Sequence, residues 1–218
     1  MREKSKFTTV ARDLPSMGCT MNQNFLSLLD KKLPNGAVSH ALEVPLGGTC
    51  VSRKDALYTV VGASVAVCLI DTETAWCSLR QVMLPSLARG HRQDAMLQAD
   101  AALEDALTRL YESAGIDAEK FSGKRVKAKL FGGSDLKATG ISYSDGEQST
   151  SFVRSWLSTR HIAVAAESLG GRCRREIVLL PGNGVVYCRK LELDDAFLDS
   201  ERNGLTPDRK DESRIELF

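Results

Sequence analysis

From Ser64 to Ile70 the chain is almost continuously apolar and rich in valine, Ser-Val-Ala-Val-Cys-Leu-Ile. Such a run, without alternating polar residues, is typical of a β-strand covered on both faces. A second strand is predicted over residues 77–84, and Pro85 ends it because proline cannot donate to a sheet. The pattern therefore predicts a sheet with packing layers on both sides.

The hydrophobic period changes after Pro85. Five apolar residues recur at helical spacing: Met96, Ala99, Leu103, Leu107 and Leu110. This spacing predicts a long helix that buries the stripe and ends at Gly115. A second, shorter helix is predicted over residues 149–157, with Ser149 or Thr150 as its N-cap.

Further strands are predicted over residues 57–61, 125–131 and 162–166, and a hairpin over 175–180 and 185–191 around Pro181–Gly184. This order predicts an α/β fold, a layered sandwich of mixed or antiparallel β-sheet with helices packed on it. We interpret residues 42–191 as the domain and residues 1–41 as an N-terminal extension with a short amphipathic segment at 25–29. Residues 192–218 are acidic, and we expect a loosely ordered, flexible tail there.

Charge, apolar runs and cysteines indicate which partners and which cellular compartment to expect. A net charge of +1 gives no reason to expect nucleic acid or an anionic membrane surface as a partner. No apolar run is long enough to span a bilayer, so membrane insertion is not expected, and the N-terminus lacks the apolar centre of a signal peptide. The six cysteines form no regular framework, which favours reduced thiols and a cytoplasmic protein.

The segment from Thr59 to Pro85, TVVGASVAVCLIDTETAWCSLRQVMLP, resembles the active-site signature of CheD, the chemoreceptor glutamine deamidase family. In that family a turn Gly-Ser-Cys precedes Val-Ala-Val-Cys, and His-Val-Met-Leu-Pro follows. Later matches are Phe131-Gly132-Gly133, the segment Ala166–Gly171 with Arg174 and Arg175 after it, and the final hairpin. The ordered motifs identify residues 42–191 as similar to CheD.

The resemblance implies a cytoplasmic chemotaxis protein that converts glutamines of methyl-accepting chemotaxis receptors to glutamate. It also implies a fold related to the catalytic domains of deamidating toxins, and a CheC-type phosphatase as a further partner. No cofactor is implied. The three histidines (His40, His91 and His161) show no ligand spacing, so no metal site is predicted.

The residues at the family's catalytic positions are substituted. Ser64 stands at the position of the nucleophilic cysteine and Gln81 at that of the histidine. The family's threonine falls on Tyr58 in an ungapped alignment, with Thr59 beside it, and we take Thr59 as the third candidate. A serine hydroxyl depends on a general base, and an amide cannot serve as one, so efficient deamidation by the family route is not expected.

Three functions stay open from the sequence: a deamidase running on altered residues, a pseudoenzyme that binds chemoreceptors or a CheC-type protein without turnover, and an unrelated amidase that uses Ser64. Each candidate residue also has an ordinary structural interpretation. Ser64 fits a tight turn, Gln81 a strand surface, and Cys50 or Cys77 the core rather than a displaced nucleophile. His91 could be a surrogate base or a solvated loop residue. Trp156 and Phe152 could be core residues or contact a partner.

Overall fold

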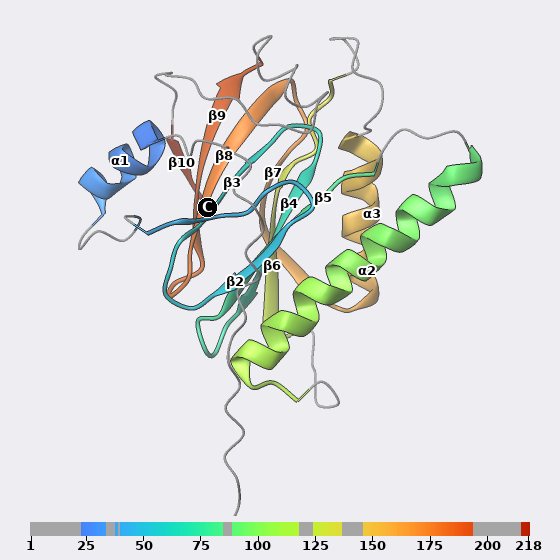
Figure 1. Cartoon of the computed structure of the whole chain (residues 1–218), viewed down its shortest axis with the longest axis horizontal. Helices are drawn as coiled ribbons and strands as arrows, with labels where there is room; N and C mark the ends of the chain where they lie inside the picture. The colour runs from blue at the N-terminus through green and yellow to red at the C-terminus, as the bar shows by residue number, and fades with distance from the viewer. Residues whose placement is uncertain are drawn as a thin grey trace, which may run out of the picture.

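The computed structural model describes residues 23–33, 38, 40–84, 89–117, 124–136, 146–193 and 215–218. Within them, ten strands form two five-stranded sheets that pack face to face (Figure 1). The first sheet has the order β1 (Leu42–Glu43), β3 (Leu57–Val61), β8 (Cys173–Leu180), β9 (Val185–Glu192) and β10 (Ile215–Leu217). The second has the order β2 (Thr49–Ser52), β5 (Cys77–Val82), β4 (Val65–Asp71), β6 (Val126–Gly132) and β7 (Ala163–Leu169).

Both sheets are mixed. The pairs β1–β3 and β6–β7 are parallel, and the other neighbouring strands are antiparallel. Strand β4 lies in the middle of the second sheet, and every residue of it is buried. The predictions of a doubly covered strand, of the hairpin β8–β9 and of a layered α/β fold are confirmed.

Helices cover the outer face of each sheet (Figure 1). Helices α2 (Arg89–Ala114) and α3 (Gly146–Thr159) pack on the second sheet, where they share a core with β4 and β6. Helix α1 (Gln23–Lys32) packs on the first sheet, where Phe25 and Leu29 are buried beside Tyr58 and Val178. A third core, which contains Cys68, lies between the sheets.

Two regions outside the predicted domain contribute to this arrangement. Helix α1 lies inside the segment 1–41 and is part of the packed structure, while residues 1–22 lie outside the described part. The expectation of a loosely ordered tail is wrong for the last four residues. Strand β10 pairs with β9 through Ile215↔Arg189, and Phe218 exchanges backbone hydrogen bonds with Val186. Residues 194–214 are not described, so the domain boundaries stay a prediction.

Two details of the predicted helices are wrong. Met96 was expected in the buried stripe of α2 but is 41% exposed, because the N-terminal turns of α2 extend beyond the sheets (Figure 1). Helix α3 begins at Gly146, so Ser149 and Thr150 lie inside it and are not its N-cap. The Ser149 hydroxyl instead accepts a hydrogen bond from the backbone N–H of Leu84, which joins α3 to the end of β5.

A partly buried ion pair joins the β4–β5 turn to the start of β6. Asp71 ends β4, accepts two hydrogen bonds from the guanidinium of Arg125, at 2.7 and 3.1 Å, and caps the turn through the N–H of Thr74. Burial alone would raise the pKa of Asp71, but these hydrogen bonds outweigh it and hold the pKa below its ordinary value. The native state therefore holds fewer protons here than the unfolded state near pH 4.

We expect Asp71→Asn to lower the free energy of unfolding by about 1.5–3 kcal/mol at pH 7, because the hydrogen bonds to a charged group weaken. The Asp71 contribution is complete above the unfolded pKa and disappears as the pH falls through the lower folded pKa. Urea unfolding between pH 7 and pH 2.5 should therefore show the two proteins converging in acid. Asp105→Asn, in an exposed pair with Arg109, is the control and should change stability by less than about 0.5 kcal/mol. A constant difference at all pH values would contradict this role of Asp71.

Candidate functional site

The three candidate residues come from both sheets and meet at one edge of the inner core. Ser64 directly precedes β4, Gln81 lies near the end of β5, and Thr59 lies in β3 of the facing sheet. The β4–β5 hairpin pairs Ala66 with Gln81, and so it brings together Ser64 and Gln81, which are seventeen positions apart in the sequence. All three side chains are buried, with at most 3% exposure.

A continuous hydrogen-bond chain joins these side chains. The Ser64 hydroxyl donates to Oε1 of Gln81 at 3.2 Å. The Gln81 amide nitrogen donates to Oγ1 of Thr59, and the carbonyl oxygens of Val44 and Val60 lie 3.2 Å from the same nitrogen. The Thr59 hydroxyl donates to the carbonyl of Val44 at 2.7 Å. The acceptors around its nitrogen orient the amide and leave its oxygen toward Ser64.

The alternative third residue, Tyr58, lies on the other side of the first sheet. Successive residues of a strand face opposite ways, and Tyr58 is buried in the core under α1 while Thr59 faces the second sheet. The structure therefore brings Thr59, and not Tyr58, to Ser64 and Gln81. The interpretation of Gln81 as a strand surface residue is wrong, because this side chain points into the inner core.

The turn that carries Ser64 fits against a glycine pair. A Cβ on Gly132 would lie 2.1 Å from the Ser64 carbonyl oxygen, and Gly132 has a φ of +108°. Gly133 donates its N–H to that same carbonyl at 2.9 Å. Only glycine permits this close approach and this backbone conformation, so the Gly-Gly motif serves to hold the turn at Ser64.

A buried arginine supports the same turn from the far side. Arg175 donates to the Ser134 hydroxyl at 2.9 Å, to the Ser168 hydroxyl at 3.2 Å and to the Gly170 carbonyl at 2.7 Å. The backbone N–H of Ser134 in turn donates to the Gly62 carbonyl at 2.9 Å. From the sequence, Arg175 was noted only as one of two basic residues in a motif, and its structural role was not predicted. Its role depends on contacts between distant segments, which no local pattern shows.

The nearby thiols are poor replacements for a nucleophile. Cys77 is buried in the inner core, and burial raises its pKa to about 12. Burial also raises the pKa of Cys50, which is half-buried on β2. A thiol reacts as its thiolate, so neither has the ionised form that deamidation needs at neutral pH. This geometry favours the interpretation of both as packing residues.

Neither histidine whose side chain the structure describes forms a hydrogen bond with Ser64. His40 and His161 are exposed. His91 lies in the first turn of α2 and not in a loop, and its side chain lies outside the described part. In the regions that the structure describes, no group of three or more His, Cys, Asp or Glu side chains is arranged to hold a metal ion.

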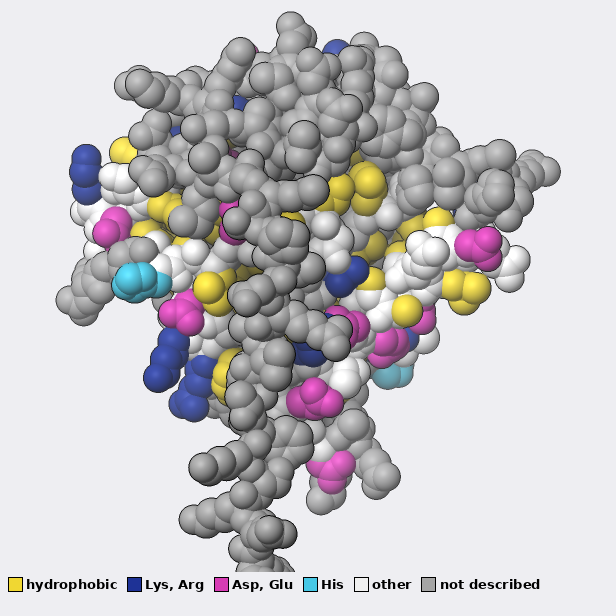
Figure 2. Space-filling model, in the orientation of Figure 1, with side chains coloured by type: hydrophobic (Ala, Val, Ile, Leu, Met, Phe, Trp, Pro, Cys, Tyr) yellow, Lys and Arg dark blue, Asp and Glu magenta, His cyan; other side chains and the backbone are white. Residues whose placement is uncertain are grey.

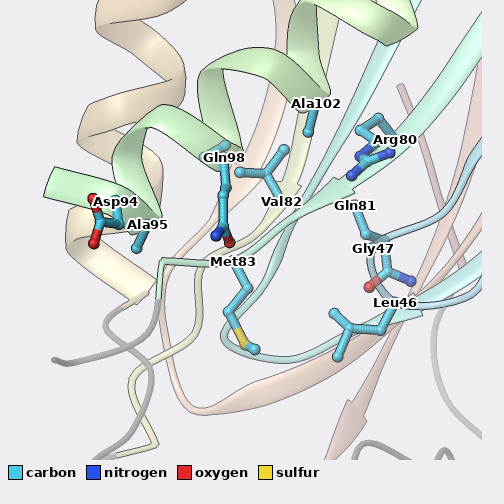
Figure 3. A pocket seen from close by; sticks show the side chains of 11 residues that line it. Leu46, Gly47, Arg80, Gln81, Val82, Met83, Asp94, Ala95, Gln98 and Ala102 are labelled. Atoms are coloured by element: carbon cyan, nitrogen blue, oxygen red, sulfur yellow. The ribbon is translucent and has the colours of Figure 1, made fainter. Parts of the chain in front are cut away.

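A pocket of about 590 Å³ lies beside Gln81, between β5, helix α2 and the turn at Leu46 and Gly47 (Figure 3). Gln81 is among the residues that line this pocket, whereas Ser64 is fully buried and does not line it. Trp156 is a core residue of α3, while Phe152 is half-buried in a second hollow between α2 and α3.

None of the described helices is both long and apolar enough to cross a membrane.

Comparisons with known proteins agree with the resemblance found in the sequence. The family model described as "CheD chemotactic sensory transduction" matches residues 83–190. "Probable chemoreceptor glutamine deamidase CheD 2" of Dechloromonas aromatica is 30% identical over 164 residues, which is 73% of this chain and 80% of the relative. The protein of that name from Chromobacterium violaceum is also 30% identical, over 67% of this chain and 71% of its own length. "Probable chemoreceptor glutamine deamidase CheD" of Ralstonia pickettii is 30% identical over 82% of this chain and 77% of its own length. On this similarity and on its layered fold, the chain belongs to the CheD family.

Proposed function

We propose that this protein is a cytoplasmic chemotaxis protein that binds methyl-accepting chemotaxis receptors and deamidates them poorly or not at all. The observation that carries the proposal is the hydrogen bond from the buried Ser64 hydroxyl to the Gln81 amide oxygen. In this arrangement the hydroxyl at the nucleophile position donates a hydrogen bond to an amide oxygen. That oxygen is not basic enough to remove the proton.

The chemistry of deamidation explains why this contact matters. A nucleophile must attack the side-chain amide carbon, and a general base must take the proton of that nucleophile. The amide oxygen of Gln81 accepts a hydrogen bond but is not a base at neutral pH. Within the described residues, the Ser64 hydroxyl has no other hydrogen-bond partner. The geometry thus supports a pseudoenzyme over both a working deamidase and an unrelated serine amidase.

The retained architecture supports a binding role. The glycine pair, the Arg175 contacts and the hydrogen-bond chain through Thr59 keep the turn at Ser64 in a defined conformation although its chemical groups have changed. The family model also matches only from residue 83, so the segment with the substituted positions lies outside the match. Relatives whose names contain "chemoreceptor glutamine deamidase" point to receptors as the partner, and the family resemblance adds a CheC-type phosphatase.

The test is mass spectrometry of chemoreceptor cytoplasmic fragments after incubation with this protein, with binding measured on the same fragments. We expect no conversion of glutamine to glutamate above a control without protein, and saturable binding. An active CheD-family deamidase is the positive control. Conversion that disappears in Ser64→Ala would overturn the proposed loss of activity, and absence of binding to any receptor fragment would overturn the adaptor role.

A further inference from the structure

The pocket beside Gln81 has an uneven distribution of charge. Its wall is largely apolar, with Leu46, Val82 and Met83 from the strands and turn and small alanines from α2. In the view of Figure 3, Arg80 and Asp94 lie on opposite sides of the pocket, with Gln98 of α2 between them. A ligand group bound near Arg80 therefore meets a positive charge, and one near Asp94 a negative charge.

Arg80 lacks the partners that a partly buried guanidinium usually has. Its one hydrogen bond among the described residues runs from Nη1 to the Thr49 hydroxyl at 2.6 Å, and its buried Nε has no acceptor. No carboxylate of the described chain forms an ion pair with it. Asp105 interacts with Arg80 electrostatically but forms its ion pair with Arg109, at 2.8 Å. Buried charges are normally paired because removing them from water is costly.

The burial of Arg80 has an electrostatic consequence. Loss of solvent lowers the pKa of this guanidinium, and the attraction of Asp105 offsets only part of that effect. Arginine still stays charged at neutral pH. A carboxylate that enters the pocket would replace the lost solvation with charged hydrogen bonds, and guanidinium favours carboxylate because the two groups match in geometry.

We propose that the pocket beside Gln81 binds the side-chain carboxylate of an acidic residue on a partner protein, with Arg80 as the group that receives it. This inference rests on the proposed function for the identity of the partner. On a chemoreceptor, the acidic residue is a glutamate formed by deamidation, so the protein prefers the converted receptor over the glutamine form. Such a preference would let a pseudoenzyme recognise the product of an active deamidase.

Exposed apolar side chains at the pocket edge and on the helix that lines it fit an amphipathic partner segment. Leu46 at the pocket edge is 39% exposed, and Met96 and Leu97, which belong to α2 but do not line this pocket, are 41% and 62% exposed. Hydrophobic side chains lie beside acidic ones over the N-terminal part of α2 (Figure 2). A helix with apolar residues next to its glutamate would cover these side chains while its carboxylate reaches Arg80.

The first test uses two small probes that differ in one group, N-acetyl-glutamate N-methylamide and N-acetyl-glutamine N-methylamide. NMR of the methyl groups of Met83 and Ala95 reports occupancy of the pocket in the full chain. We expect the glutamate probe to bind at least about tenfold more tightly, as one added charge-assisted contact predicts. Arg80→Gln should reduce this preference to less than about twofold, and Arg80→Lys should keep part of it because the charge remains.

Arg154→Gln is the matched control, since it removes an exposed arginine of α3 that pairs with Glu167 and does not line the pocket, and it should keep the preference. Equal binding of the two probes, no binding of either, or a preference that survives Arg80→Gln would overturn the inference.

The second test uses a chemoreceptor cytoplasmic fragment before and after treatment with an active CheD-family deamidase. Tighter binding of the treated form, lost in Arg80→Gln, is the expected result. Equal binding of both forms overturns the proposed preference and leaves the proposed receptor binding intact. Binding of the glutamate probe without binding of either fragment overturns the proposed function and leaves the carboxylate site intact.

Discussion

The double substitution Ser64→Cys and Gln81→His is expected to produce glutamine deamidase activity at least about 10²-fold above that of the parent protein. A positioned general base alone contributes about 10²–10⁴-fold to proton-transfer chemistry. The thiol adds a nucleophile that ionises far more easily than a hydroxyl, above all beside a histidine. Mass spectrometry of chemoreceptor fragments, with glutamate formation followed over time, measures this gain.

The existing hydrogen-bond chain is the reason to expect that a histidine would be correctly oriented. The two ends of the Gln81 amide already face Ser64 on one side and Thr59 on the other. The Thr59 hydroxyl donates to the Val44 carbonyl, so its oxygen is left to accept from residue 81. An imidazole would then donate one ring N–H to Thr59 and present its other nitrogen, unprotonated, to residue 64.

Single variants and a matched pair identify the source of the activity. Ser64→Cys alone should stay near the parent because it lacks a base, and Gln81→His alone should show at most weak activity. In the double variant, Thr59→Val should lower the rate about tenfold or more, since the histidine loses its orienting acceptor. Tyr58→Phe changes the neighbouring residue on the other side of the sheet and should have little effect. A double variant that folds, binds receptor and stays silent would contradict the claim that the remaining site is intact.

Local patterns were sufficient to predict seven of the ten described strands and the two longer helices, but not the short strands β1, β2 and β10. The valine-rich run became the buried strand β4, and the alternation at 125–131 became β6 with its two faces distinguished. The hairpin signal Pro181–Gly184 lies between β8 and β9. These elements are predictable because burial of a strand and the conformation of a turn determine which residue types occur at neighbouring positions in the sequence.

The parts of the site that depend on the facing sheet could not be predicted in this way. The alternation of β3 shows that Tyr58 and Thr59 face opposite ways, but not which of them faces the inner core. That choice is made by α1, which covers the outer face of the first sheet and buries Tyr58. The environment of Arg80 is equally invisible in the sequence, because it depends on how α2 lies against β5.

Loss of the buried charge partner in Glu176→Gln is expected to lower the free energy of unfolding by about 3–5 kcal/mol. Glu176 and Arg189 are direct cross-strand partners on β8 and β9, and the guanidinium donates to Oε2 of Glu176 from Nε at 2.6 Å. Arg189 is completely buried, and its guanidinium carbon lies 4.8 Å from the centre of the Phe25 ring on α1. A neutral glutamine would leave this arginine charged in a site that water does not reach.

Lys190→Gln, the next residue on β9, is the matched control. Lys190 pairs with Glu216 at 2.9 Å, but both side chains are at least one-third exposed, so its loss should cost less than about 1 kcal/mol. Replacing both buried partners, Glu176→Leu with Arg189→Met, should recover most of the stability, because neither buried charge remains. Urea unfolding measures all three variants. If Glu176→Gln costs no more than Lys190→Gln, then α1 does not seal the first sheet in solution. A large difference would place this helix, from the segment first interpreted as an extension, within the folded domain.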